Sequence, residues 1–286
     1  PKIESGPSSI AIQELFLEGE IADSQLRMIF AACHPDLKAQ DQIAFALKTI
    51  SGFSQKEIAA SLLLKEETVK KRLARARKTI VEKGLEFKIP NNEELPLRLV
   101  RVQEVLYLIF NEGFHSIQQA YLVREDLCAE AMRLCKMLLQ NPLTQLPSVH
   151  AHFALMCFNL ARLDSKTNEL GEVISLKEQD RSSWDDKLIT IGHFHMSMAV
   201  ETKTFSGYHF EAAIAAEHVS AKTWESTNWQ NILHWYEQLN ALQPSPFNDL
   251  NRAVIYVHLE TFQKAKEILD KVDPKSLEQR AYLYYG

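Results

Sequence analysis

Hydrophobic residues recur along this chain at intervals of three and four, and β-branched residues rarely cluster. A period near 3.6 residues is typical of amphipathic helices, so the pattern predicts an almost wholly helical, all-α protein. The presence of only nine glycines among 286 residues agrees with this fold class. No apolar run is long enough to cross a bilayer and no signal peptide is recognisable, so we expect a cytoplasmic protein without a membrane partner.

Breaks in the hydrophobic pattern predict two domains. Residues 1–21 are expected to be a linker, and residues 22–88 to form a compact unit of four helices. Gly84, Pro90 and Pro96 then interrupt the pattern, which places a second linker at 89–96. Residues 97–286 are predicted to be a helical repeat-like domain, because "NRAVIYVHLETFQKAKEIL" (251–269) resembles a tetratricopeptide-type helix pair. Its helices are expected near 97–111, 124–140, 147–163, 181–199, 208–222, 227–241 and 248–258, with a last pair from 261.

The segment "GFSQKEIAASLLLKEETVKKRLARARKTI" (52–80) predicts two helices joined by a tight turn. Ser54 and Glu57 have the spacing of a capping box. The second helix has one apolar seam, formed at helical spacing by Val69, Leu73, Ala76 and Ile80. Two helices joined in this way, the second one cationic, are typical of a helix-turn-helix that inserts its second helix into the DNA major groove. The turn lacks the customary glycine, since Leu63 stands in its place.

Charge along the chain is uneven. Ten basic and five acidic residues lie between Ser54 and Lys88, so this region carries +5 although the whole chain carries −5. A local excess of positive charge indicates a polyanion partner for this region alone. The alternative is a basic helix face that is merely solvated. The predicted DNA-binding residues are Thr68, Lys70, Lys71, Arg72, Ala74, Arg75, Arg77 and Lys78.

The remaining polar clusters predict no enzyme, no metal and no cofactor. His193 and His195 are two residues apart on a predicted helix and would point in different directions. Asp180, followed by two serines, is typical of a helix N-terminus. The four cysteines form no metal-binding spacing and are expected to be reduced and buried. Trp224, Trp229, Trp235 and Tyr236 form an aromatic group that belongs either to the core or to a concave ligand surface.

Residues 52–80 resemble region four of bacterial RNA polymerase sigma factors of the extracytoplasmic-function type. "LRMIFAACHPDL" (26–37) resembles the start of region four in a subgroup with a long helical C-terminal extension. "YLIFNEGF" (107–114), "LKEQDRSSWD" (176–185), "FEAAIAAEHVSA" (210–221) and "SPFNDLNRAV" (245–254) resemble that extension. The positions that match within the helix-turn-helix are Gly52, Ser54, Glu57, Ile58, Ala59, Leu62, Thr68, Val69, Lys70, Arg72, Leu73, Arg75, Ala76 and Arg77.

The resemblance implies that the module reads the promoter −35 element and docks on the β-subunit flap of RNA polymerase. Lys71, Ala74 and Arg75 would then contact bases, and Lys70, Arg72 and Arg77 would contact phosphates. Glu66 and Glu67 would be helix caps. Region two, which melts the promoter in such factors, has no counterpart in residues 1–21, so we expect this chain to be a fragment of a longer protein that also continues past Gly286.

Two hypotheses follow. In the first, the chain is a transcription initiation factor whose acidic C-terminal domain, with a regulatory protein or ligand as partner, shields or buttresses region four. In the second, it is a helical-repeat interaction scaffold in which the helix-turn-helix docks protein without direct DNA binding. The two differ in whether binding depends on salt and on Lys71 and Arg75.

Overall fold

The computed structural model describes residues 24–62, 64–85, 90–91, 93–114, 125–166 and 174–273. Over these residues the protein is all-α, as predicted, with twelve α-helices and no strand. The helices are α2 (Ser24–Ala32), α3 (Ala39–Thr49), α4 (Gln55–Ser61), α5 (Glu66–Lys83), α6 (Glu94–Phe114), α7 (Glu125–Gln140), α8 (Pro147–Leu160), α9 (Asp186–Ala199), α10 (Gly207–Ser220), α11 (Trp229–Leu242), α12 (Pro246–His258) and α13 (Phe262–Leu269). Within the described ranges, no helix has the length and hydrophobicity needed to span a membrane.

Helix α6 begins inside the predicted linker 89–96. The backbone N–H of Glu94 donates to Asn91 Oδ1 (3.0 Å), and the Glu94 carboxylate accepts from the Asn91 N–H (3.2 Å). This reciprocal pair has the geometry of a capping box. Pro96 falls in the first turn of α6, where a helix needs no backbone donor. The proline therefore marks the start of the helix, where the sequence pattern predicted an interruption.

The core runs without a break across this junction. One face of α6 packs on α2, α3 and α4, and another packs on α7 and α8. Leu95 and Leu99 near the start of α6 and Ile109 and Phe110 near its end are all fully buried in one cluster. Arg98, itself buried, donates a hydrogen bond of 3.1 Å to the carbonyl oxygen of Phe30 in α2. Helix α6 is thus a shared wall between the first four helices and the rest of the molecule.

The helices after α6 pack mainly on their neighbours in sequence, α8 on α9, α10 on α11, α11 on α12 and α12 on α13, while α10 also packs on α8. Small hydrophobic clusters fill each of these junctions in turn. The contact of α8 with α9 requires Gly192, because a Cβ there would lie 2.5 Å from the ring of Phe158. While α7 and α8 also contribute to the large core around α6, α9 to α13 are held by a chain of smaller local contacts.

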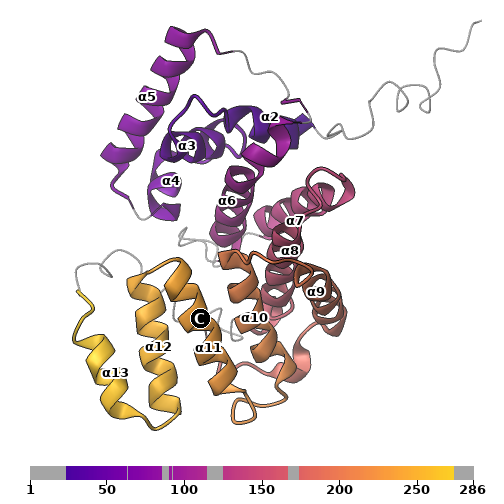
Figure 1. Ribbon diagram of the computed structural model, residues 1–286, viewed down its shortest axis with the longest axis vertical. Helices are drawn as coiled ribbons and strands as arrows, with labels where there is room; N and C mark the ends of the chain where they lie inside the picture. The colour runs from indigo at the N-terminus through magenta and orange to yellow at the C-terminus, as the bar shows by residue number, and fades with distance from the viewer. Residues whose placement is uncertain are drawn as a thin grey trace, which may run out of the picture.

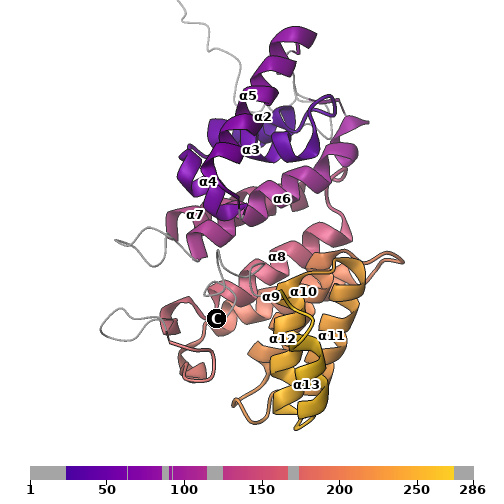
Figure 2. The same cartoon turned by 90° about the vertical axis from the view of Figure 1, so that its left-hand side faces the viewer.

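Helix α5 and the last helices lie at opposite ends of the molecule (Figures 1 and 2). In both views α5 stands at one end of the long axis, and α12 and α13 lie toward the other, with α6, α7 and α8 between them (Figures 1 and 2). Helix α5 packs on α3 and α4. The outer face of α5 is therefore left open to solvent.

Candidate nucleic-acid interface

The helix preceding the basic helix begins as predicted. The Glu57 N–H donates to Ser54 Oγ (3.1 Å), and the Ser54 N–H donates to Glu57 Oε2 (2.7 Å). Together these bonds satisfy two backbone donors that a helix start leaves open, which typically contributes about 1 kcal/mol. Ile58 and Ala59 of the same helix are buried and receive α5. The predicted capping box is confirmed.

The apolar seam of α5 also lies where the spacing placed it. Val69, Leu73 and Ala76 are buried, and Ile80 packs partly buried against the same core. Gly84 ends the helix with φ +58°, a left-handed conformation in which its N–H caps the carbonyls of Ile80 and Val81. The question of strain at Leu63 lies outside the described residues. The seam fixes the rotation of α5, and hence which side chains face outward.

Two expected helix caps are not caps. Lys65 occupies the N-cap position of α5 and makes no side-chain cap hydrogen bond. Glu66 and Glu67 lie in the first turn and are exposed. Their charge still favours the positive end of the helix dipole, but they do not satisfy its backbone donors as caps do. The prediction was wrong in this respect because an acid in the first turn and an N-cap residue differ by only one or two positions.

The eight predicted DNA-binding residues all lie outside the seam. At 100° per residue, Lys71, Ala74 and Lys78 project from the side of α5 opposite the seam. Lys70 and Arg77 lie on one flank, and Thr68, Arg72 and Arg75 on the other. All are exposed except Thr68 and Arg72, which are partly buried. The helix therefore presents a continuous cationic surface, which we call the basic face, made of Thr68, Lys70, Lys71, Arg72, Ala74, Arg75, Arg77 and Lys78.

Ion pairs engage part of the basic face. The Arg75 guanidinium donates a 2.8 Å hydrogen bond to the carboxylate of Asp41 on α3, and this bond and the charge of Asp41 raise the pKa of Arg75. Lys78 lies 3.6 Å from Glu82. Within the part of the chain that the structure describes, Lys70, Lys71, Arg72 and Arg77 make no ion pair. These four cations are available to a polyanion without first giving up a partner.

Sequence reasoning missed the Asp41 contact. Asp41 is buried among the apolar positions of α3, at helical spacing from Ala44 and Phe45. An acid on the inward face of an amphipathic helix is a signal for a cationic partner, because buried carboxylates are seldom left without one. That signal was present in "QDQIAF" (40–45) but did not name Arg75.

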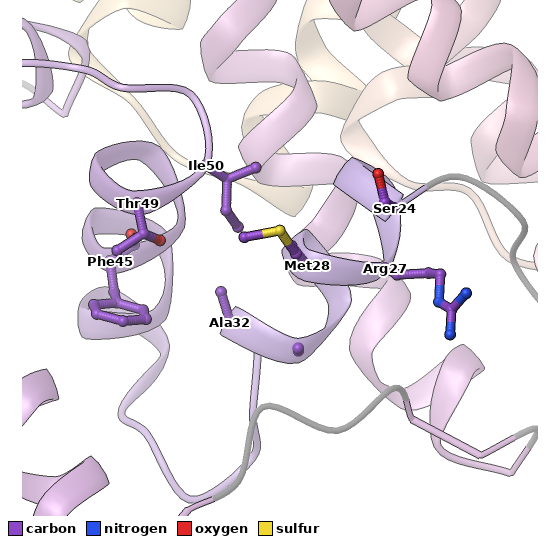
Figure 3. Close-up of a pocket in the computed structure, with 8 residues that line it drawn as sticks. Ser24, Arg27, Met28, Ala32, Phe45, Thr49 and Ile50 are labelled. Carbon is purple, nitrogen blue, oxygen red and sulfur yellow. The ribbon is translucent and has the colours of Figure 1, made fainter.

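An apolar groove lies on another side of the same four-helix unit. It has a volume of about 360 Å³ and lies between α2 and the end of α3. Met28 extends toward Ile50 across the groove, while Arg27 points away from it (Figure 3). Met28 is 54% exposed, so a flexible apolar side chain stands open to solvent where a partner could pack on it. No sequence prediction named these residues.

In the second half, the polar residues that the sequence singled out cap helices or contact a neighbouring helix. Asp180 caps only a short 3₁₀ turn (Arg181–Ser183), and α9 is capped by Asp185, whose carboxylate accepts from two backbone N–H groups. The prediction of a helix start at Asp180 was therefore early, since both aspartates carry the same signal. His195 lies on α9 with its Nδ1 2.8 Å from Nδ1 of His150. Across the described residues, no group of His, Cys, Asp and Glu side chains is arranged to hold a metal ion.

All four cysteines are free and buried, as expected. Burial raises the pKa of Cys33, Cys128 and Cys157 to about 12 and raises that of Cys135 further. Thiols held neutral in this way are unreactive. The cysteines therefore act as small apolar core residues.

Comparison with known proteins divides the chain at α6. Residues 27–80 match the family described as Sigma-70, region 4, and residues 98–200 match a family of unknown function, DUF6596. An uncharacterized protein from Rhizobium meliloti (strain 1021) is 34% identical over 263 residues, which cover 92% of this chain. The chain spans only 61% of the length of that relative. No solved structure matches the chain.

The region 4 match covers α3, α4 and most of α2 and α5, including the capping box, the seam and the whole basic face. The geometry and the family agree on the same residues. Residues 27–80 are a sigma-70 region 4 helix-turn-helix domain, from a non-enzymatic DNA-binding family, and a helical domain that matches a family of unknown function follows it.

Proposed function

We propose that this chain is part of a transcription initiation factor of the extracytoplasmic-function sigma type, working in the cytoplasm, where polymerase and chromosome are. Its basic face would bind the promoter −35 element in the major groove. The observation that carries the proposal is a set of four cations on α5 that make no ion pair within the described residues, three of them exposed and Arg72 partly buried. The opposite side of this helix is held by a buried seam. A helix anchored on one side and cationic on the other can enter a groove without losing its support.

Individual roles follow from position on the helix. Lys71 and Lys78 project furthest from the seam, and Ala74 lies beside them. A base edge would lie against Lys71 and Ala74, since an alanine methyl can contact a thymine methyl. Lys70, Arg72 and Arg77 on the flanks would contact phosphates. Arg75 would contact a base only after breaking its hydrogen bond to Asp41. While that bond remains, Arg75 would hold α5 against α3. We assign Arg75 to the base-contacting residues, provided that it first breaks its hydrogen bond to Asp41.

The apolar groove supports a second part of the proposal, docking on RNA polymerase through the β-subunit flap. A groove lined by Met28, Phe45 and Ile50 fits an apolar segment of a partner. The groove and the basic face involve different residues. A factor could therefore hold polymerase and DNA at the same time.

The second half would be a tetratricopeptide-like regulatory domain. The packing of successive helices on one another supports the repeat-like assignment. Of the two regulatory hypotheses, the structure favours buttressing, because α6 packs on α2, α3 and α4 while α5 packs on α3 and α4. Shielding of the basic face by the acidic half would need a different arrangement of the domains. In the proposed division, 22–88 and 97–286 remain the two units, with α6 as their common wall.

The test is fluorescence-anisotropy binding of the full chain to a duplex DNA pool across a salt series. We expect Lys70→Ala with Arg77→Ala to weaken binding about tenfold and to reduce the salt slope by about two, because two phosphate-neutralising cations are lost. The matched control is Lys187→Ala with Lys203→Ala, two exposed lysines of the second half. It makes the same change in net charge.

Equal salt slopes in both double variants would contradict DNA binding through the basic face. If wild type and control also bind DNA weakly and without salt dependence, the alternative function, a helical-repeat interaction scaffold without direct DNA binding, is favoured. Adding RNA polymerase core then decides whether region 4 binds DNA only within the larger assembly.

A further inference from the structure

The second half contains a pocket that the proposed DNA and polymerase contacts do not use. It has a volume of about 660 Å³ and lies where α6, α8, α10, α11 and α12 converge. Leu155, Ile214 and Leu239 supply apolar walls, and Arg162, Glu211 and Tyr236 supply polar groups. Small-molecule sites have this size and this mixture of apolar walls and a few polar side chains. The residues come from distant parts of the sequence, and α10–α12 lie outside the 98–200 family match.

Arg162 forms no ion pair within the residues that the structure describes. Its guanidinium donates a hydrogen bond of 3.1 Å to Asn159 Oδ1. Burial, followed by the charge of nearby Arg181, lowers the pKa of Arg162 to about 10. Arg181 is itself directed at backbone, donating to the carbonyl oxygens of His218 and Ala221. Desolvating an unpaired guanidinium is costly, so its position at a pocket wall indicates an anion that arrives from outside.

The Glu211 carboxyl, on another wall of the pocket, carries a reduced charge near neutral pH. The Tyr107 hydroxyl donates a 2.6 Å hydrogen bond to Glu211, and burial raises the pKa of Glu211 to about 7. Tyr236 also lines the pocket, and its hydroxyl accepts a 3.1 Å hydrogen bond from the Asn251 side chain. A half-protonated carboxyl can accept from or donate to a neutral group but would repel a second anionic group. The pocket thus has one strongly anion-seeking end and one hydrogen-bonding end.

We propose that this pocket binds a small organic anion, with a carboxylate or phosphate group against the Arg162 guanidinium and a neutral hydrogen-bonding or apolar end toward Glu211. The planar guanidinium fork suits either group, because both present two oxygens to parallel N–H donors. The apolar walls favour a ligand with a hydrocarbon body over a bare inorganic ion. This inference does not depend on DNA binding, since it concerns only residues of the second half.

Titration of the full chain with small anions, followed by calorimetry and ligand-observed NMR, tests whether the pocket binds them. The probes are benzoate and phenyl phosphate, with benzamide as the uncharged analogue of benzoate. We expect saturable binding of at least one anion with a dissociation constant below about 20 mM, and binding of benzamide weaker by about tenfold, since a charge-assisted hydrogen bond contributes that much. Which anion binds more tightly identifies the ligand class as a carboxylate or a phosphate ester.

Arg162→Gln should weaken binding of the favoured anion by about tenfold or more, and Arg162→Lys, which keeps the charge and loses the fork, by less. Arg133→Gln is the matched control, because Arg133 on α7 pairs with Glu130 and does not line the pocket. The thermal midpoint of Arg162→Gln without probe should equal or exceed that of wild type, because a partly buried cation without an ion-pair partner among the described residues is removed.

Two results would overturn the proposal: no saturable binding of either anion to wild type, or equal binding by Arg162→Gln and wild type. The last result would assign Arg162 a purely structural role. Circular dichroism of each variant shows whether it is folded. Arg162→Lys supplies the binding comparison if the glutamine variant does not fold.

Discussion

The Arg75 guanidinium on α5 lies 2.8 Å from the Asp41 carboxylate on α3, and it is the one base-contacting candidate that is held by a neighbour. The Asp41 side chain is 4% exposed, while that of Arg75 is 53% exposed. The buried partner is fixed and the exposed one can swing away. This pair therefore opposes DNA binding by Arg75 while it fixes the rotation of α5 on α3.

Asp41→Asn should release Arg75 for DNA. We expect DNA affinity at low salt to rise about threefold and the salt slope to steepen by about one, because one more cation becomes available to phosphate. Anisotropy across a salt series measures both. The control is Asp164→Asn, an exposed acid of the second half that makes the same change in net charge. An equal rise in both variants would mean that net charge alone is responsible.

Met28→Glu should abolish polymerase docking without weakening DNA binding. A carboxylate placed in an apolar groove would be desolvated on docking without a partner, so affinity for polymerase core should fall at least about tenfold. Biolayer interferometry with immobilised core enzyme measures this. Val257→Glu on α12, where the native side chain is similarly exposed at 47%, is the control. Unchanged docking by Met28→Glu would exclude the groove as the polymerase site.

Removing α6 should unfold the region 4 unit in this chain. A chain of residues 24–95 lacks Leu99, Val102 and Leu106, all of which are buried in the common core. We expect no cooperative thermal transition by circular dichroism, because the apolar faces of α2 and α3 are left uncovered. A cooperative melt near that of the full chain would instead show that 22–88 is an independent domain.

Arg98→Ala tests the contact between α6 and α2 without truncating the chain. It removes a buried donor to the Phe30 carbonyl and an ion pair with Glu94 at 3.3 Å. The free energy of unfolding in urea should fall by about 2–4 kcal/mol. Arg133→Ala removes a half-exposed pair with Glu130 and a contact with the Met137 sulfur, and it should cost less than about 1 kcal/mol because these contacts are open to solvent. Similar losses in both variants would argue against a special role for Arg98.

Glu211 should make stability depend on pH. Its pKa is raised by burial from 4.5 to about 7, so the folded state favours the protonated carboxyl. Its contribution is fully present below pH 4.5 and is lost as pH rises through 7. Between pH 5 and pH 8 the wild type should lose about 2–3 kcal/mol relative to Glu211→Gln. Urea unfolding at the two pH values measures this, with Glu267→Gln as the exposed control; identical pH slopes in all three proteins would refute it.

Local features were predictable from sequence because they depend on spacing within one helix. The capping box at Ser54 and the seam of Val69, Leu73 and Ala76 involve residues three or four positions apart, and the structure has them. The basic face followed from the seam, since a helix that buries one side exposes the other. Its eight residues remain predictions as DNA contacts.

Relationships between helices were not predictable in this way. The pairing of Arg75 with Asp41 depends on how α5 is rotated against α3, and the meeting of Arg162 and Glu211 at one pocket depends on the packing of α8 and α10. The start of α6 was missed because Pro96 signals a break whether it precedes a helix or lies in its first turn. Asp180 and Asp185 carry equal cap signals, and only the fold distinguishes them.

The position of α6 has a consequence for the history of the gene. The region 4 match ends at residue 80 and the match of unknown function begins at residue 98, inside this helix. Recombination in the interval between them would leave most of α6 with the second family and separate Arg98 from Phe30. A region 4 domain with a new partner would need a replacement helix to cover α2, α3 and α4, and the second family would need a new partner that fits the exposed face of α6, so this helix favours inheritance of the two as one unit.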